Sequence, residues 1–249
     1  MTMLAVERIK LFSTRSPWWC ALITLVVTIG YAALLASTTD DPRFMRIEFA
    51  ELGYSFGLAV VMVLAALTVT TEYRFNTIKT TFQAHPNRAT ALLAKAGVVG
   101  VLSFVLGEIA GFGAWGMAAL LSPEADLALR SAGDWVNVVG IGPVYAFGAA
   151  LAIGVGLLIR HSAGAIALLL IYSLAVEDLV RMIPNIGEDV FRWMPFNVAD
   201  KFVSGNGDSR GGLRLSTSEL TQPWALAYFG TITVIVLALG IVTAKRRDA

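Results

Sequence analysis

Few side chains in this sequence combine a type and a spacing suited to chemistry. Glu108 lies within a long apolar stretch, and Glu177 and Asp178 follow directly after another. His85 and His161 lie in short polar links beside positive charge, where we expect ordinary surface residues rather than catalysts or ligands. The chain has no phosphate-binding GxxxxGK loop and no HExxH zinc motif. We therefore predict no catalytic residue and no metal site, and no ATP bound by this chain in the usual way.

Glu108 is the ionisable side chain that lies deepest in an apolar segment. Burying a lone carboxylate costs several kcal/mol, so this group must be neutral, paired or in contact with water. It could form a substrate or proton site. It could equally hold packed helices together beside Gly107 and Gly111, a GxxxG pair that lets a second helix approach closely. A proton relay needs ionisable partners in series, and the sequence offers no other mid-span charge.

A short basic stretch between two apolar segments, from Leu67 to Lys95, carries the strongest functional signal. Within it Phe75, Ile78 and Phe82 recur at helical spacing, and polar residues take the other side until Pro86 ends the helix. A short helix with one apolar face suits docking into a groove of a partner protein. The alternative is a loop on the membrane surface that has no partner.

The composition determines which elements must position these residues. Of the 249 residues, 56% are hydrophobic and 15% are charged, and the mean hydropathy is +0.69. Soluble domains carry about 25% charged residues. Apolar blocks of some twenty residues predict a polytopic membrane protein, the alternative being a soluble protein with buried helices. Nothing in the charge pattern indicates a nucleic-acid partner.

We predict an all-α membrane protein whose residues 1–249 form a single transmembrane domain with six transmembrane helices. The spans cover about 18–37, 52–70, 96–121, 135–159, 163–179 and 224–243. Residues 1–15 form an N-terminal interfacial helix, residues 71–95 a connecting loop, and residues 180–223 an external region with short helices. At Glu177-Asp178 the fifth helix either continues into a wetter zone or turns back within protein. A signal peptide is the alternative for the first block, which exceeds the usual ~7–15 apolar residues.

The distribution of basic residues predicts the orientation. Six spans put both termini on one side, and most of the 19 lysines and arginines fall on that side. They are Arg8, Lys10, Arg15, Arg74, Lys79, Arg88, Lys95, Arg160, Lys245, Arg246 and Arg247. Lysine and arginine in short loops near span ends mark the cytoplasmic face. We expect a multi-pass protein of the cell (plasma) membrane with both termini in the cytoplasm.

The sequence resembles a known family at the basic stretch. TEYRFNTIKTT (residues 71–81), followed by Pro86-Asn87-Arg88 and Leu93-Ala94-Lys95, is similar to the (G/T)EYRxxTI(R/K)TT…PxR…AK signature of ABC-2 type ABC transporter permeases of actinobacterial kind. ERIKLFSTRSPWW (residues 7–19) resembles the entry segment of that family. WMPF (residues 193–196) resembles the element before its last span. Thr71 stands where the family usually has glycine.

The resemblance implies an architecture and a set of partners. Two permeases, identical or different, pair in the lipid membrane and bind two separate ABC ATPase subunits, which hold ATP and Mg. The permease itself carries no cofactor and is not an enzyme. Its first cytoplasmic loop is a coupling helix that docks on the ATPase. Substrate passes along a dimer interface lined by the first, second and fifth spans, and short external or re-entrant helices follow the fifth.

On this basis the chain is expected to be the permease subunit of an ATP-driven exporter. Its expected role is the efflux of a hydrophobic or amphipathic substrate (drug, peptide or lipid). The expected coupling residues are Glu72, Tyr73, Arg74, Phe75, Thr77, Ile78, Lys79, Thr80, Thr81 and Phe82. Glu7 and Lys10 are the expected contacts of the N-terminal helix, and Glu108 is a possible intramembrane polar site. Two alternatives are a stand-alone secondary transporter or channel that uses Glu108, and a membrane scaffold without transport.

Overall fold

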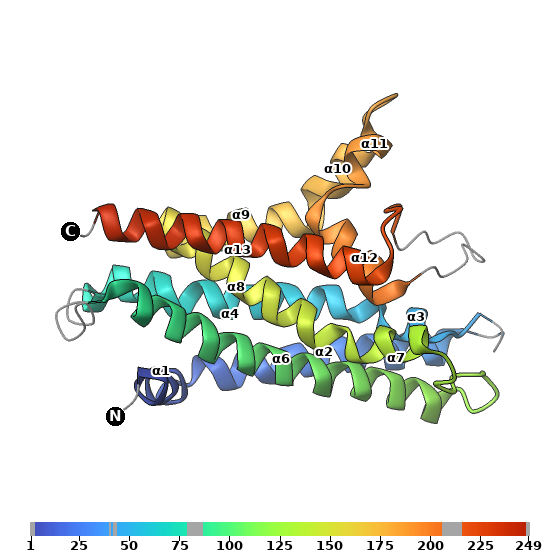
Figure 1. The fold of residues 1–249 in the computed structure, drawn as a ribbon. Helices are drawn as coiled ribbons and strands as arrows, with labels where there is room; N and C mark the ends of the chain where they lie inside the picture. The colour runs from blue at the N-terminus through green and yellow to red at the C-terminus, as the bar shows by residue number, and fades with distance from the viewer. Residues whose placement is uncertain (1–2, 40, 42–43, 79–86, 206–215, 248–249) are drawn as a thin grey trace.

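The computed structural model in Figure 1 describes residues 3–39, 41, 44–78, 87–205 and 216–247. These described residues form helices and connecting segments and contain no strand. Six helical segments among them are long and apolar enough to cross a membrane: Ser16–Thr38, Ile47–Arg74, Arg88–Leu121, Ala132–Ile159, Ser162–Arg181 and Gln222–Arg247. The predicted all-helical architecture with six candidate spans, typical of a multi-pass membrane protein, is confirmed.

Short helices complete or connect these segments. In chain order the elements are α1 (Met3–Phe12), α2 (Ser16–Thr38), α3 (Ile47–Ala50), η1 (Glu51–Gly53), α4 (Tyr54–Arg74), α6 (Arg88–Leu121), α7 (Ala132–Val139), α8 (Ile141–Ile159), α9 (Ser162–Ile171), η2 (Tyr172–Val176), α10 (Glu177–Arg181), α11 (Gly187–Phe191), α12 (Pro195–Ser204) and α13 (Gln222–Arg247).

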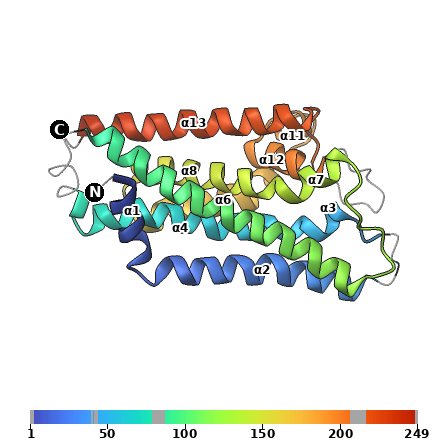
Figure 2. The same cartoon turned by 60° about the horizontal axis from the view of Figure 1, so that its bottom comes forward.

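The long helices lie side by side around α8, as Figures 1 and 2 show. Helix α8 packs against α4, α6 and α13, and its span is the most buried of the six. The spans Ser16–Thr38 and Ser162–Arg181 are the least buried. Helix α1 and the C-terminal end of α13 lie at one end of the bundle, and α3, α7 and α12 lie at the other.

Glycines allow the central helices to approach closely. A Cβ atom on Gly107 would lie 2.7 Å from the Cα of Gly142, and one on Gly111 would lie 2.6 Å from the carbonyl oxygen of Val138. The predicted GxxxG pair of α6 therefore faces α7 and α8. A Cβ on Gly154 of α8 would similarly lie 2.8 Å from the backbone nitrogen of Leu237 in α13. Small residues at such crossings let helix backbones touch in a membrane.

Two helices extend beyond the predicted spans at the end where α1 lies. Helix α4 continues to Arg74, and α6 begins at Arg88 rather than at residue 96. The side chain of Asn87 caps α6 by accepting a hydrogen bond from the Thr90 amide. The 34 residues of α6 span about 51 Å, whereas a bilayer has about 30 Å of hydrocarbon. Its first turns, which carry Arg88 and Lys95, therefore extend beyond the hydrocarbon core of the bilayer.

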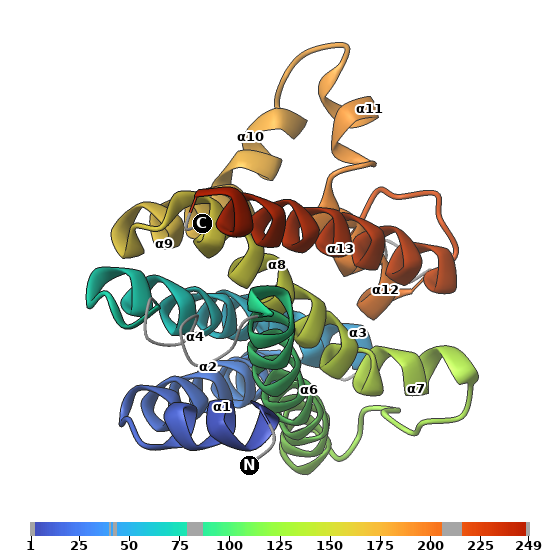
Figure 3. The same cartoon turned by 60° about the vertical axis from the view of Figure 1, so that its left-hand side comes forward.

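The structure decides how the fifth span ends, for which the sequence left two alternatives open. The chain stays helical through the π-helical segment η2 and α10 to Arg181, so the helix continues past Glu177-Asp178. Helices α10 and α11 project from the bundle, as Figures 1 and 3 show, and α12 returns to pack against α13. A π-helical turn contains one residue more than an α-helical turn and is rare outside functional or strained positions.

Candidate functional site

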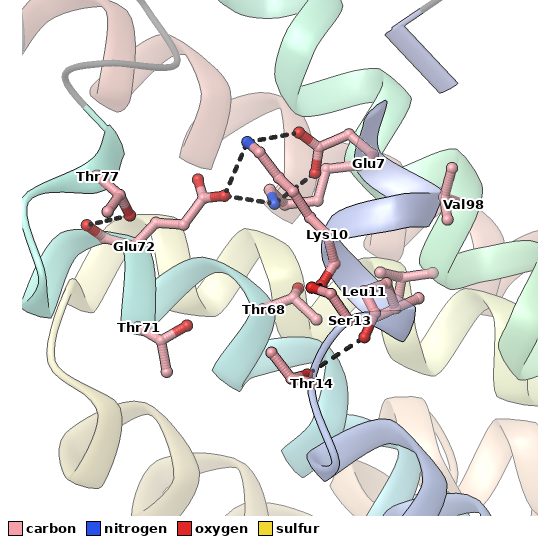
Figure 4. Close-up of a pocket in the computed structure, with 12 residues that line it drawn as sticks. Glu7, Lys10, Leu11, Ser13, Thr14, Thr68, Thr71, Glu72, Thr77 and Val98 are labelled. Atoms are coloured by element: carbon pink, nitrogen blue, oxygen red, sulfur yellow. Dashed lines mark hydrogen bonds and ion pairs between the residues drawn. The ribbon is translucent and has the colours of Figure 1, made fainter. Parts of the chain in front are cut away.

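Four charged side chains join α1, α4 and α6 at one end of the bundle. The Lys95 ammonium donates hydrogen bonds to Glu7 Oε2 at 2.6 Å and to Glu72 Oε1 at 2.9 Å. The Lys10 ammonium donates to Glu7 Oε1 at 3.1 Å and to Glu72 Oε1 at 3.4 Å. Figure 4 shows Glu7, Lys10 and Glu72 pointing toward one another. We call Glu7, Lys10, Glu72 and Lys95 the ion-pair network.

The ion-pair network is balanced in charge and largely buried. Lys95 is 5% exposed and Glu7 is 6% exposed, whereas Lys10 faces solvent. Burial would raise the pKa of Glu7, but the Lys95 and Lys10 ammonium groups outweigh it and hold that pKa below its usual value. Burial would lower the pKa of Lys10, but the Glu72 and Glu7 carboxylates raise it above its usual value. Glu7 and Lys10 are therefore charged at neutral pH.

A cavity of about 430 Å³ lies beside the ion-pair network. Side chains from α1, α4, α6 and the short segments next to them line it, as Figure 4 shows. The second carboxylate oxygen of Glu72, Oε2, is buried and has no hydrogen-bond partner in the described part of the chain. An unsatisfied buried oxygen is costly, which disfavours this position of the Glu72 carboxylate. The ion pairs with Lys95 and Lys10 offset that cost and hold Glu72 in place.

The residues that follow Glu72 lie in the last turn of α4 and in the bend after it. Tyr73 and Arg74 complete the last turn of α4, and the Arg160 guanidinium lies 4.9 Å from the centre of the Tyr73 ring. Phe75 is 67% exposed, and the Arg74 guanidinium lies over its ring. Asn76 then adopts a left-handed conformation with φ of 56°, which redirects the chain.

The remaining predicted coupling residues divide between the bundle interior and the surface. Ile78 is 4% exposed and belongs to the hydrophobic core, whereas Thr77 is exposed and lines the cavity. Phe75 and Ile78, predicted to share one docking face, thus point to different surroundings. Lys79, Thr80, Thr81 and Phe82 lie outside the described residues.

The central position of Lys95 was not predicted from the sequence. There this lysine appears at the end of the basic stretch, among the basic residues that set the orientation, and in the resemblance. A signal for its role exists: a lysine at the start of a long apolar helix must find a carboxylate or reach solvent. Its partners Glu7 and Glu72 are 88 and 23 residues away, so local spacing could not identify them.

The opposite end of the bundle holds a second group of acidic side chains. The Glu177 carboxylate accepts hydrogen bonds from the backbone amides of Phe196 at 3.0 Å and Asn197 at 2.8 Å, and so binds the first turn of α12. The Tyr54 hydroxyl donates a hydrogen bond to the Asp200 carboxylate of α12. These contacts attach α12 to the fifth and second spans.

Replacing Asp200 by asparagine should change how stability depends on pH. Burial raises the pKa of Asp200 to about 7, aided by the charges of Glu177 and Asp178 and opposed by the hydrogen bond from Tyr54. The folded protein keeps a proton that the unfolded chain releases near pH 4, so this stabilisation is lost as pH rises from about 4 to about 7. Thermal unfolding of purified protein should therefore show the wild type losing stability relative to Asp200→Asn over this range. Parallel profiles for the two proteins would contradict the assignment.

Glu108 occupies a different environment from both groups. Its carboxylate lies against Gly142 of α8, where an added Cβ atom would clash with Oε1. Oε1 is buried and has no hydrogen-bond partner among the residues that the structure describes. The structure therefore places Glu108 at the α6–α8 crossing and not within the ion-pair network.

The charged side chains that meet at the α1 end of the bundle connect helices. Among the described residues no group of three histidine, cysteine or acidic side chains is placed to hold a metal ion. The charged groups that come together form ion pairs that connect helices. In comparisons with known proteins, the sequence matches no protein-family model and no curated protein.

Proposed function

We propose that this chain is the membrane-spanning permease subunit of an ATP-driven ABC-2 type exporter. The observation that carries the proposal is the ion-pair network beside Phe75. It fastens the N-terminal helix α1 to the end of α4 and the start of α6, where the basic stretch resembles a coupling segment. A force applied to the segment between α4 and α6 would be transmitted to three helices together.

The charge distribution supports the orientation that this function needs. Under the proposal α1 lies in the membrane interface, and both termini and the segment between Arg74 and Arg88 face the cytoplasm. Helices α10, α11 and α12 then lie at the outer face as short external or re-entrant helices. ATP and Mg would be bound by separate ATPase subunits, whose docking must differ between the closed and open states of the permease to shift that equilibrium.

The exposure of two spans supports pairing with a second permease. The spans Ser16–Thr38 and Ser162–Arg181 are the least buried of the six and expose large apolar side chains such as Val26, Leu168 and Ile171. Lipid covers such faces in a monomer, and a second permease would cover them in a dimer. A hydrophobic or amphipathic substrate (drug, peptide or lipid) suits a path along an apolar interface of this kind.

The structure favours different roles for the predicted coupling residues. Glu72 was expected either to dock on the ATPase or to anchor the loop, and its pairing with Lys95 supports anchoring. Exposed Arg74 and Phe75 are better placed to meet a partner. A buried aromatic anchor in a protein interface commonly contributes 2 kcal/mol or more to binding.

Replacing Phe75 by alanine should uncouple the ATPase without unfolding the permease. We expect Mg-ATP hydrolysis that co-purifies with the tagged full chain from native membranes to fall about tenfold or more, because the exposed ring is lost from the interface. The matched control is Phe44→Ala, since Phe44 is 50% exposed and precedes α3 at the other end of the bundle. Wild-type chain that purifies without any ATPase, or equal activity in both variants, would refute the proposal.

A further inference from the structure

The end of the bundle opposite the ion-pair network contains a cavity of about 190 Å³. The helices α3, α4 and α12 and the turn η1 contribute its walls, and Figures 1 and 3 show α3 and α12 at this end. The polar groups that line it are Glu48, Glu51, Tyr54, Ser55, Asp200 and Ser204. None of these side chains was expected to form a site from the sequence.

Glu51 is the unusual member of this lining. It is 1% exposed, and both of its carboxylate oxygens are buried without a hydrogen-bond partner among the described residues. Neutralisation by a proton would not satisfy the group, because a protonated carboxyl still has a donor and an acceptor to pair. Leaving such a group unsatisfied lowers stability, and more so when the group is charged. A binding partner that supplies hydrogen-bond donors would remove this cost.

The cavity lining contains two further acidic groups that can accept hydrogen bonds, Glu48 and Asp200. Asp200 is held toward the cavity by the hydrogen bond from the Tyr54 hydroxyl. The Tyr54 carbonyl in turn accepts from the Tyr145 hydroxyl at 2.9 Å, which lies 3.3 Å from the Thr28 hydroxyl. This chain of contacts fixes Tyr54 in position and leaves Glu48, Glu51 and Asp200 as acidic groups around one space.

The spacing of these acids argues against a bare metal ion. No three acidic, histidine or cysteine side chains of the described chain converge as metal ligands would. A primary ammonium group has three N–H donors and can reach acceptors that are further apart. The cavity exceeds by several fold the space of one water molecule, about 30 Å³ in the liquid, so a small organic cation fits.

We propose that Glu48, Glu51 and Asp200 form a binding site for a primary ammonium group at this end of the bundle. The Glu51 carboxylate accepts two of the N–H donors, and the Asp200 or Glu48 carboxylate accepts the third. The ammonium belongs either to a small soluble amine or to the headgroup of an amphiphile such as phosphatidylethanolamine. Binding here is independent of any ATPase partner.

The test titrates n-propylammonium chloride into the purified full chain in phosphatidylcholine nanodiscs, followed by calorimetry at pH 8 and constant ionic strength. We expect saturable binding of n-propylammonium, and none of n-propanol, which has the same shape without the charge. Glu51→Gln should weaken the binding at least tenfold, because it removes the charge that faces the ammonium. Glu124→Gln, an exposed acid outside the cavity, is the matched control and should bind as the wild type does.

Three results would overturn the proposal: no binding by the wild type, equal binding of n-propanol, or unchanged binding in Glu51→Gln. If Glu51→Gln does not purify as a folded protein, Glu48→Gln replaces it, since Glu48 is only half-buried and makes a milder change. Adding phosphatidylethanolamine to the nanodiscs distinguishes the two sources of the ammonium. Competition with n-propylammonium identifies a lipid headgroup as the ligand, and unchanged binding identifies a soluble amine.

Discussion

Replacing Lys95 by methionine should lower the free energy of unfolding by about 3–5 kcal/mol and abolish coupling to the proposed ATPase. Lys95 is buried and pairs with both Glu7 and Glu72, so its removal leaves two carboxylates that share only the exposed Lys10. Breaking a buried ion pair by removing one partner costs this much because a buried charge loses its compensation. Unfolding in mixed detergent micelles, followed by circular dichroism, measures the change.

A second variant separates the loss of the pair from the loss of the lysine stem. The double variant Lys95→Met, Glu7→Gln removes one charge of each sign, so it should be more stable than Lys95→Met alone. Lys245→Met, an exposed lysine at the same end of the bundle, serves as the control and should change stability little. A double variant less stable than Lys95→Met would show that Lys95 acts through packing and not through its charge.

Replacing Gly107 by alanine should destabilise the bundle by about 1–3 kcal/mol, and replacement by valine should cost more. The added Cβ would lie 2.7 Å from the Cα of Gly142 and 2.8 Å from the carbonyl oxygen of Ile141, so α6 and α8 must move apart. Both neighbours are backbone atoms, which cannot move aside as a flexible side chain can. Inserting atoms into a well-packed interface carries this cost. The same unfolding measurement applies.

The matched control lies on the same helix. A Cβ atom on Gly100 of α6 would meet no atom within 4 Å, so Gly100→Ala carries no steric cost. Alanine favours a helix over glycine by about 0.5–1 kcal/mol, so this variant should be as stable as the wild type or more stable. Equal destabilisation by the two substitutions would mean that the close α6–α8 approach does not limit stability.

The spans could be predicted from the sequence because each is a local property of some twenty consecutive apolar residues. Their ends could not, since α4 and α6 continue through charged residues such as Glu72 and Lys95, whose partners lie on other helices. Mean hydropathy falls at these residues although the helix does not stop. The GxxxG pair at Gly107 was recognisable in the sequence, but its partner Gly142 was not.

The candidate sites were harder to predict from the sequence than the spans were. The sequence placed Glu7, Lys10 and Glu72 among the functional residues, but their meeting depends on how α1 folds back against α4 and α6. Phe75 and Ile78 have helical spacing, yet Asn76 lies between them with a positive φ and sends them in different directions. The contact between Tyr54 and Asp200 joins residues 146 positions apart, so no local pattern could predict it.

The π-helical segment Tyr172–Val176 sets the direction in which the fifth span ends. The π-helical turn takes in one residue more than an α-helical turn, so the chain after it lies about 100° back around the axis and about 1.5 Å back along it, relative to an uninterrupted α-helix. Every side chain after Val176 is therefore rotated by that angle. Glu177 is the first of them, and its carboxylate meets the amides of Phe196 and Asn197. This rotation within the fifth span thus points Glu177 toward the first turn of α12. It thereby positions α12, which contributes Asp200 to the wall of the 190 Å³ cavity.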